Sequence, residues 1–147
     1  MTNTNEYGEV DHGRIADDVA WSLALDEATK VVGAFQVIHA RGEVGGGPRA
    51  VARSGHMGMY VRGFADGKGE NGLHSHPTDA IWIVLEGAAT FHGMNETLLG
   101  ELTAKEGILV PAGESYRFRC NGPSVLARIS VADTDAHGDA PPVTGST

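Results

Sequence analysis

Two histidines separated by one residue are the clearest chemical feature of the chain. The stretch "GLHSHPTDAIWIVLEG", residues 72–87, contains His74 and His76 directly before Pro77. In an extended strand, side chains at positions i and i+2 point to the same face. The two imidazoles would then lie side by side, as ligands of a divalent metal ion do. We therefore expect His74 and His76 to be metal ligands.

Further ligands have to come from neighbouring residues. Asp79 is a candidate carboxylate. In a regular strand it would point to the opposite face from His74 and His76, because it lies an odd number of positions from each. In that case it would be a surface turn residue. A bulge at "HPTD" would redirect it, because Pro77 cannot donate to a strand ladder. His92 in "AATFHG" would join if its strand faces the same pocket. Two histidines and one carboxylate with open positions suit Fe(II) or a similar ion.

Short strands must position these side chains. The chain has 147 residues, and its 21 glycines separate short apolar runs, which is typical of strands joined by tight turns. No βαβ pattern is present, so we expect an all-β sandwich or barrel. We expect residues 88–93 to be the hairpin partner of 80–87. The remaining predicted strands are residues 33–40, 57–64, two strands within 108–122 around a Pro-Ala-Gly turn, and 124–132.

The two ends of the chain have a different character from the centre. Asp17 or Asp18 could cap a short helix carrying Trp21, and a partly buried arm fits this segment equally well. Residues 133–147 lack apolar periodicity, which predicts a disordered tail. The expected division is an N-terminal arm (1–32), a barrel (33–132) and a tail (133–147).

Charge and composition exclude several classes of protein. Lys and Arg total 11 against 19 Asp and Glu, giving a formal net charge of −8 that disfavours binding to nucleic acid. No run of about 18 apolar residues predicts a membrane span, and no secretory signal is evident at the start. A single cysteine, Cys120, allows no internal disulfide. These features predict a soluble, cytoplasmic protein without membrane partners.

Residues 67–87 and 107–121 resemble the two signature motifs of the cupins. His74, His76 and Gly87 fall in register with the first motif, and Pro111 and Gly113 with the second. The resemblance implies an all-β fold, the double-stranded β-helix or jelly-roll barrel of that family. It also implies a homodimer, because cupins commonly pair by sheet extension, with the N-terminal arm contributing.

The resemblance breaks at two of the four metal ligands. Cupins of the usual type hold a metal through two His and one Glu of the first motif and one His of the second. The Glu position falls here on Ala80 and the His position on Tyr116. Which residues replace these two ligands stays open at the level of sequence.

Two further residues are candidates for catalysis. Tyr116 carries a phenol with a pKa of about 10, which makes it a poor metal ligand and a good hydrogen-bond donor to developing oxyanion character. Arg62 lies two residues after Tyr60; if that face points inward, its guanidinium could hold a carboxylate or enolate, and otherwise it is a surface arginine. Phe118 shares the face of Tyr116 and completes an apolar wall.

The function that these residues and the resemblance predict is a small-molecule enzyme. It would use a divalent transition metal (Fe, Mn, Ni or Zn) and act as a dioxygenase, isomerase or lyase on an oxygenated substrate. The first alternative is a metal-free cupin that binds a small ligand without catalysis. A second alternative is metal-independent acid–base isomerisation by His74 with Tyr116. The sequence names neither the substrate nor the metal.

Overall fold

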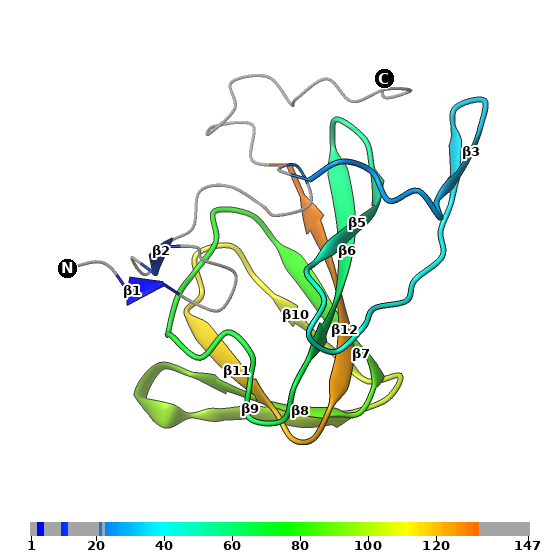
Figure 1. Cartoon of the computed structure of the whole chain (residues 1–147). Coiled ribbons are helices and arrows are strands. Elements are labelled where there is room, and N and C mark those ends of the chain that lie inside the picture. Colours follow the sequence, from blue (N-terminus) through cyan, green and yellow to red (C-terminus); the bar gives the residue numbers. More distant parts are fainter. Residues whose placement is uncertain (1–2, 5–9, 12–20, 22, 133–147) are drawn as a thin grey trace.

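Two antiparallel sheets face each other and form the body of the protein (Figure 1). The computed structural model describes residues 3–4, 10–11, 21 and 23–132. One sheet has five strands in the order β10-β7-β12-β6-β5, and the other has three in the order β11-β8-β9. The predicted all-β jelly-roll fold is confirmed.

The strand bounds place the apolar runs of the sequence in these two sheets. The five-stranded sheet contains β5 (Arg49–Arg53), β6 (Met57–Phe64), β7 (Ala80–Glu86), β10 (Gly107–Val110) and β12 (Ser124–Val131). The three-stranded sheet contains β8 (Ala88–Gly93), β9 (Leu98–Thr103) and β11 (Tyr116–Cys120). Outside them lie the pairs β1 (Asn3–Thr4) with β2 (Val10–Asp11) and β3 (Lys30–Val32) with β4 (Phe35–Val37), and a 3-10 turn, η1 (Met94–Glu96).

The core between the sheets is dominated by aromatic rings. Phe118 of β11 packs against Phe91 and Trp82 with ring centroids 4.8 Å away in both cases. Such offset contacts favour the packing beyond the area that they bury. The rings therefore join β7 of one sheet to β8 and β11 of the other. Further members of this core are Tyr60, Phe64, Val84, Ala89, Val110, Tyr116, Cys120 and Leu126.

The predicted pairing of residues 80–87 with 88–93 is wrong. β7 pairs with β10 and β12, whereas β8 pairs with β9 and β11. Both edges of each strand are thus already occupied. Gly87, with a φ of +87°, passes the chain from one sheet to the other, and a Cβ there would lie 2.3 Å from Ser124 Oγ.

The N-terminal arm is described only in part. Residues 17–20 of the expected helix and the predicted tail, 133–147, lie outside the described residues. Trp21 donates its indole N–H to the carbonyl of Ser54 over 3.1 Å and packs on the core, as a partly buried arm would. The expected arm–barrel boundary after residue 32 falls at the turn of the β3–β4 hairpin. In the part of the chain that is described, no helix is long and apolar enough to cross a membrane.

A close backbone approach at Gly69 gives the first testable prediction. A Cβ at Gly69 would lie 2.2 Å from the carbonyl oxygen of Phe118, because the neighbouring Glu70 carbonyl accepts the N–H of Phe118 over 2.9 Å. We expect Gly69→Ala to lower the free energy of unfolding by about 2 kcal/mol or more, since the backbone has to shift. Chemical denaturation measures this.

The matched control is Gly47→Ala. Nothing lies within 4 Å of a Cβ built on Gly47, so this variant should unfold within about 0.5 kcal/mol of the wild type. Equal stability of the Gly69 and Gly47 variants would contradict the argument.

Candidate metal centre

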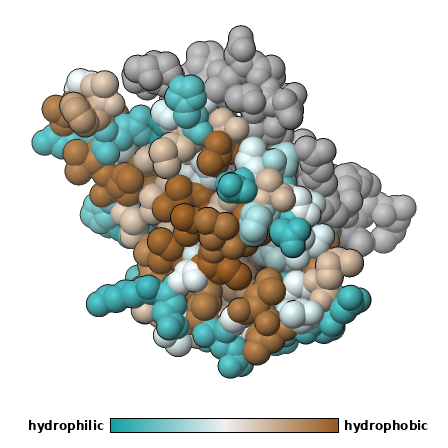
Figure 2. Space-filling model, turned by 180° about the vertical axis from the view of Figure 1, so that it is seen from behind, coloured by the Kyte–Doolittle hydropathy of each residue, from teal (hydrophilic) through white to brown (hydrophobic). Residues whose placement is uncertain are grey.

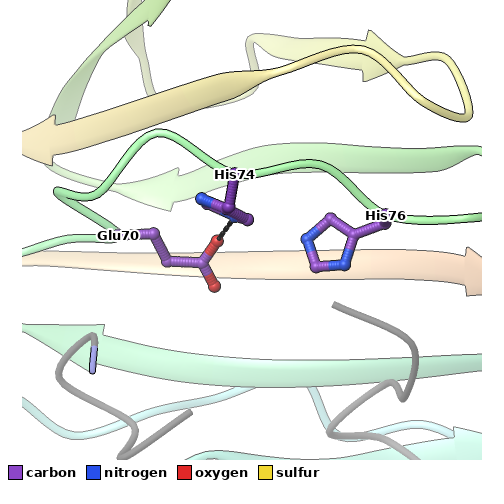
Figure 3. Close-up of side chains that lie close together, drawn as sticks. All are labelled: Glu70, His74 and His76. Carbon is purple, nitrogen blue, oxygen red and sulfur yellow. Dashed lines mark ion pairs between the residues drawn. The ribbon is translucent and has the colours of Figure 1, made fainter. Parts of the chain in front are cut away.

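Three buried side chains with metal-ligating atoms meet inside the barrel. Glu70, His74 and His76 come from the segment between β6 and β7, and only 1%, 2% and 4% of their surfaces are exposed. One ligand atom from each lies within 4.8 Å of the other two. Figure 3 shows Glu70 directed at His74, with His76 beside them. Nitrogen and oxygen donors of this kind suit a divalent transition metal.

Backbone hydrogen bonds to the β10–β11 region hold this segment in place. His74 and Tyr116 exchange both backbone hydrogen bonds, at 3.0 and 2.8 Å. The N–H of Gly113 donates to the carbonyl of His76 over 2.8 Å. The two histidines therefore project together, with ring centroids 5.0 Å apart, as their spacing in the sequence predicts.

The environment of His74 fixes which nitrogen faces the cluster. Nδ1 lies 2.7 Å from the carbonyl oxygen of Gly72, and because a carbonyl only accepts, Nδ1 must donate its proton there. Nε2 lies 2.7 Å from Glu70 Oε1. A histidine oriented by a backbone carbonyl in this way presents its other nitrogen as a ligand. The residues present therefore fit a metal ion, which Glu70, His74 and His76 would hold through one ligand atom each.

Tyr116 connects the two ends of the cluster. Its phenol oxygen lies 3.2 Å from His76 Nε2 and 3.3 Å from Glu70 Oε1, and it accepts the indole N–H of Trp82 over 2.9 Å. Burial, followed by the charge of Glu70, raises the pKa of the Tyr116 phenol well above its usual value. The phenol thus stays protonated and acts as a hydrogen-bond donor inside the site.

A buried arginine of β12 contributes charge to the site. Arg128 is 1% exposed and lies between Tyr60 and Trp82 in the strand register, with its guanidinium 5.9 Å from the Trp82 ring centre. Its positive charge lowers the pKa values of both His74 and Tyr116. Arg128 therefore helps to compensate the negative charge of Glu70 in the interior.

Arg62 lies on the inward face, one of the two placements that the sequence allowed. It lies two residues from each of the buried Tyr60 and Phe64, on the same face of β6, and its guanidinium stacks 5.0 Å from the centre of the Phe64 ring. Stacking on an aromatic face is a frequent arrangement for arginine. A role for Arg62 in holding a substrate stays a prediction.

Asp79 and His92 do not join the cluster. Asp79 is exposed, and its Oδ1 accepts the N–H of Ala112 over 2.8 Å, so it stabilises the β10–β11 turn. His92 is half-buried and alternates with the inward Phe91 and Gly93 on β8, which directs it away from the core. Among the described residues, the candidate ligands that come together are His74 and His76, with Glu70 as the carboxylate.

Glu70 is not among the ligands that the sequence predicts, because the expected carboxylate follows the two histidines and Glu70 precedes them. The composition of the segment "ADGKGENG" predicts a polar turn, so the sequence gives no reason to expect the Glu70 side chain to be buried. The available signal was the spacing: Glu70 precedes His74 by four residues in a stretch too short and glycine-rich to form a helix. Only the docking of this stretch on β11 brings the carboxylate inside.

A cavity of about 460 Å³ has Tyr116 among its lining residues, whereas Glu70, His74 and His76 do not line it. It lies between the β8–β9 turn and the β10–β11 turn, and Glu114 is the one charged residue among those that line it. The lining is mainly apolar, with Leu99, Ile108 and Val110 contributing side chains. Size and lining suit a small organic molecule.

Comparison with solved structures identifies the fold. The chain is similar to a cupin superfamily protein from Desulfitobacterium hafniense, with 20% identity, a TM-score of 0.54 and coverage of 73% of this chain and 94% of that chain. A cupin of the RmlC-like type from Shewanella frigidimarina shows 15% identity, a TM-score of 0.53 and coverage of 74% and 87%. A protein from Bacillus halodurans shows 26% identity, a TM-score of 0.53 and coverage of 57% and 68%.

These likenesses extend to the fold alone. No family model matches the sequence, and no curated protein matches it either. The neighbours are small single-domain cupins, which confirms the resemblance carried by the two motifs.

The contact between Glu70 and His74 gives a pH-dependent prediction for the metal-free protein. Burial by itself lowers the pKa of His74, but the hydrogen bond and charge of Glu70, with the carbonyl of Gly72, raise it above 6.5. A raised pKa stabilises the folded state fully below pH 6.5, and this contribution disappears as the pH rises through the folded pKa. We expect Glu70→Gln to lower the titration midpoint of the His74 ring in NMR spectra.

The stability difference between the two proteins supplies the control. The wild type should exceed Glu70→Gln in free energy of unfolding by more at pH 6 than at pH 9. An unchanged midpoint together with a pH-independent difference would show that Glu70 does not set the charge of His74.

Proposed function

We propose that this chain, a cupin by fold, is a small-molecule enzyme that depends on a divalent metal held by Glu70, His74 and His76. The observation that carries the proposal is the convergence of these three ligand atoms within 4.8 Å inside a buried site. Buried ionisable groups cost free energy unless they are paired or bind a metal. A cluster of this composition beside a cavity is therefore expected to serve chemistry.

The donor set defines the class of metal. Two imidazole nitrogens and one carboxylate suit Fe, Mn, Ni or Zn and leave positions open for a substrate. When bound, the metal would supply Lewis-acid polarisation of a substrate oxygen or, with a redox-active ion, activation of O2. Dioxygenase, isomerase and lyase activities all fall within this proposal.

The protein's own residues would orient the substrate and stabilise the negative charge that develops on it. The Tyr116 phenol is fixed by the Trp82 indole and stays protonated, and its one O–H, which donates to Glu70 in this structure, would instead donate to a substrate oxygen as negative charge develops there. The apolar cavity beside Tyr116 would exclude water and hold the carbon skeleton of an enol, phenol or diketone.

Metal content is the first measurement that tests the proposal. We expect near-stoichiometric metal in the purified wild type by inductively coupled plasma mass spectrometry, and its loss in the His74→Ala/His76→Ala double variant. Glu70→Gln should weaken metal affinity by at least 10-fold, because it removes the anionic ligand. Asp79→Asn and His92→Ala should keep the wild-type content, because neither residue reaches the cluster.

Absence of metal from the wild type, even after reconstitution with Fe(II), Mn(II), Ni(II) and Zn(II), would overturn the metalloenzyme proposal. Loss of metal in the Asp79 or His92 variants would instead show that the ligand set is wrong.

The role of Tyr116 gives a separate prediction. Tyr116→Phe should retain the metal but lower kcat by about 100-fold, as expected when a donor to a developing oxyanion is removed. A panel of enols, phenols and diketones is first screened with the wild type. The value of kcat is then measured for both proteins on a compound that the wild type converts, by oxygen uptake and product analysis. An unchanged kcat with a raised KM would assign Tyr116 to substrate binding alone.

One observation favours the alternative of a metal-free ligand-binding protein. Glu70 lies within hydrogen-bonding distance of His74 and of Tyr116, and Tyr116 also lies within that distance of His76, so these buried groups have partners even without an ion. His76→Ala separates the two functions: it should abolish metal binding in the enzyme and leave ligand affinity largely intact in the binding protein. Acid–base isomerisation by His74 with Tyr116 would be insensitive to chelators.

We also propose that the protein is a homodimer acting on a small molecule, in keeping with the implication of the cupin resemblance. The cytoplasmic location stays a prediction from the sequence.

A further inference from the structure

Arg128 brings a positive charge into the interior of the barrel. Among the described residues it is the one lysine or arginine that is buried, with 1% of its surface exposed. It lies in the middle of β12, opposite Tyr60 of β6 on one side and Trp82 of β7 on the other. Because a guanidinium is always protonated in proteins, this position carries a permanent charge.

The strands around Arg128 are apolar on their other face as well. Ile81, Ile129 and Met59 lie opposite one another there, and each alternates with the inward residues of its strand. Figure 2 shows that apolar residues gather at the centre of this side of the molecule. With apolar side chains on both faces of the sheet, water screens the charge of Arg128 only weakly, so its field extends through the core.

This charge reaches the cluster of candidate metal ligands. The guanidinium lies 5.9 Å from the ring centre of Trp82, whose indole N–H donates to the Tyr116 hydroxyl over 2.9 Å. The Tyr116 oxygen in turn lies 3.2 Å from His76 Nε2. Arg128 also acts to lower the pKa values of His74 and Tyr116, against the effects that raise them. Arg128 is therefore within electrostatic range of both residues.

Small side chains form the next row of the inward face. Ser130 of β12 lies opposite Gly58 of β6 and Ala80 of β7. Ser130 and Ala80 are buried, with 2% and 3% of their surfaces exposed. These three strands therefore place no large side chain in the interior on this side of Arg128. Ala80 is also the position at which the first sequence motif would carry a Glu, so β7 presents no carboxylate there.

Positive charge exceeds negative charge in this part of the interior once a divalent ion is bound. Glu70 is the one acidic side chain among the buried residues that the structure describes. The ion and Arg128 together carry three positive charges against the single negative charge of Glu70. Arg62 lies diagonally across from Arg128 on the same face, because it is opposite Leu126. Since uncompensated charge in the interior costs free energy, an anionic ligand is favoured over a neutral one.

We propose that the substrate is a small carboxylic acid with a second oxygen function, and that Arg128 holds its carboxylate. This inference rests on the proposed function and narrows its enols, phenols and diketones to those that carry an ionised carboxyl group. A guanidinium can donate two parallel hydrogen bonds to a carboxylate, which fixes the orientation of the ligand. The second oxygen is then available to the Tyr116 hydroxyl. Arg128 determines specificity in this arrangement.

Isothermal titration calorimetry on the Zn(II)-loaded full-length protein tests the proposal with two matched pairs of probes. Salicylate is compared with salicylamide, and acetoacetate with acetoacetamide. Each amide keeps the shape and the second oxygen of its acid and lacks the charge. We expect the wild type to bind each acid about 10-fold more tightly than its amide, or better, as a charge-assisted hydrogen bond provides. This comparison depends on no variant.

Three variants assign the preference to a residue. Arg128→Gln should abolish the preference for the acids and leave the affinity for the amides largely unchanged. Arg62→Gln should reduce the preference less, because Arg62 is proposed to act only through its charge. Arg117→Gln is the control: Arg117 pairs with the exposed Glu96, so its loss should leave the preference intact. Metal content and thermal unfolding show whether each variant is loaded and folded.

The outcomes separate this inference from the proposed function. Equal affinities of the wild type for acid and amide, or no binding of either acid, would overturn the carboxylate proposal while stoichiometric metal leaves the metalloenzyme standing. Loss of the preference in Arg62→Gln or Arg117→Gln, but not in Arg128→Gln, would overturn the assignment to Arg128. If the wild type takes up no metal, the metalloenzyme fails, and the same titrations on the metal-free protein decide whether Arg128 selects carboxylates.

Discussion

The buried contact between Glu70 and His74 is the constraint on which the site depends. A carboxylate and an imidazole are enclosed in the interior, where removal of one partner from a buried pair costs about 3–5 kcal/mol. The segment that carries them must therefore lie where each of the two groups has a hydrogen-bond partner or an opposite charge. The hydrogen bonds of His74 with Tyr116 and of Gly113 with His76 supply that position. Trp82 and Arg128 then supply a donor and a positive charge to the same interior.

The aromatic core and the site share the same side chains. Trp82 packs on Phe118 and Tyr60, and its indole nitrogen also orients the phenol of Tyr116. A change that loosens this packing would therefore disturb the cluster as well. This coupling holds the segment between β6 and β7, which carries the ligands, against rigid strands, and so keeps the ligand atoms in position more effectively than a loop alone would. Tyr116, which links the ligands, is also one of the residues that line the cavity.

The two faces of the five-stranded sheet carry residues with different roles. The inward face supplies Tyr60, Trp82 and Arg128, while the outward face carries Met59, Ile81 and Ile129. Because successive side chains of a strand alternate, the same strands can line the site on one face and present other residues on the opposite face. Changes on the outer face are thus expected to leave the ligands unaltered.

The sequence by itself determined the all-β class, most of the strands and the pairing of His74 with His76, because alternation and a spacing of two are local properties. It also placed Tyr116 and Phe118 on one inward face of a strand. Only the tertiary structure decided that β7 and β8 belong to different sheets, since strand partners are chosen by contacts distant in sequence. The same holds for the carboxylate: Asp79 turns outward to a backbone N–H, and Glu70 is brought inside because a glycine lets its segment lie directly against β11.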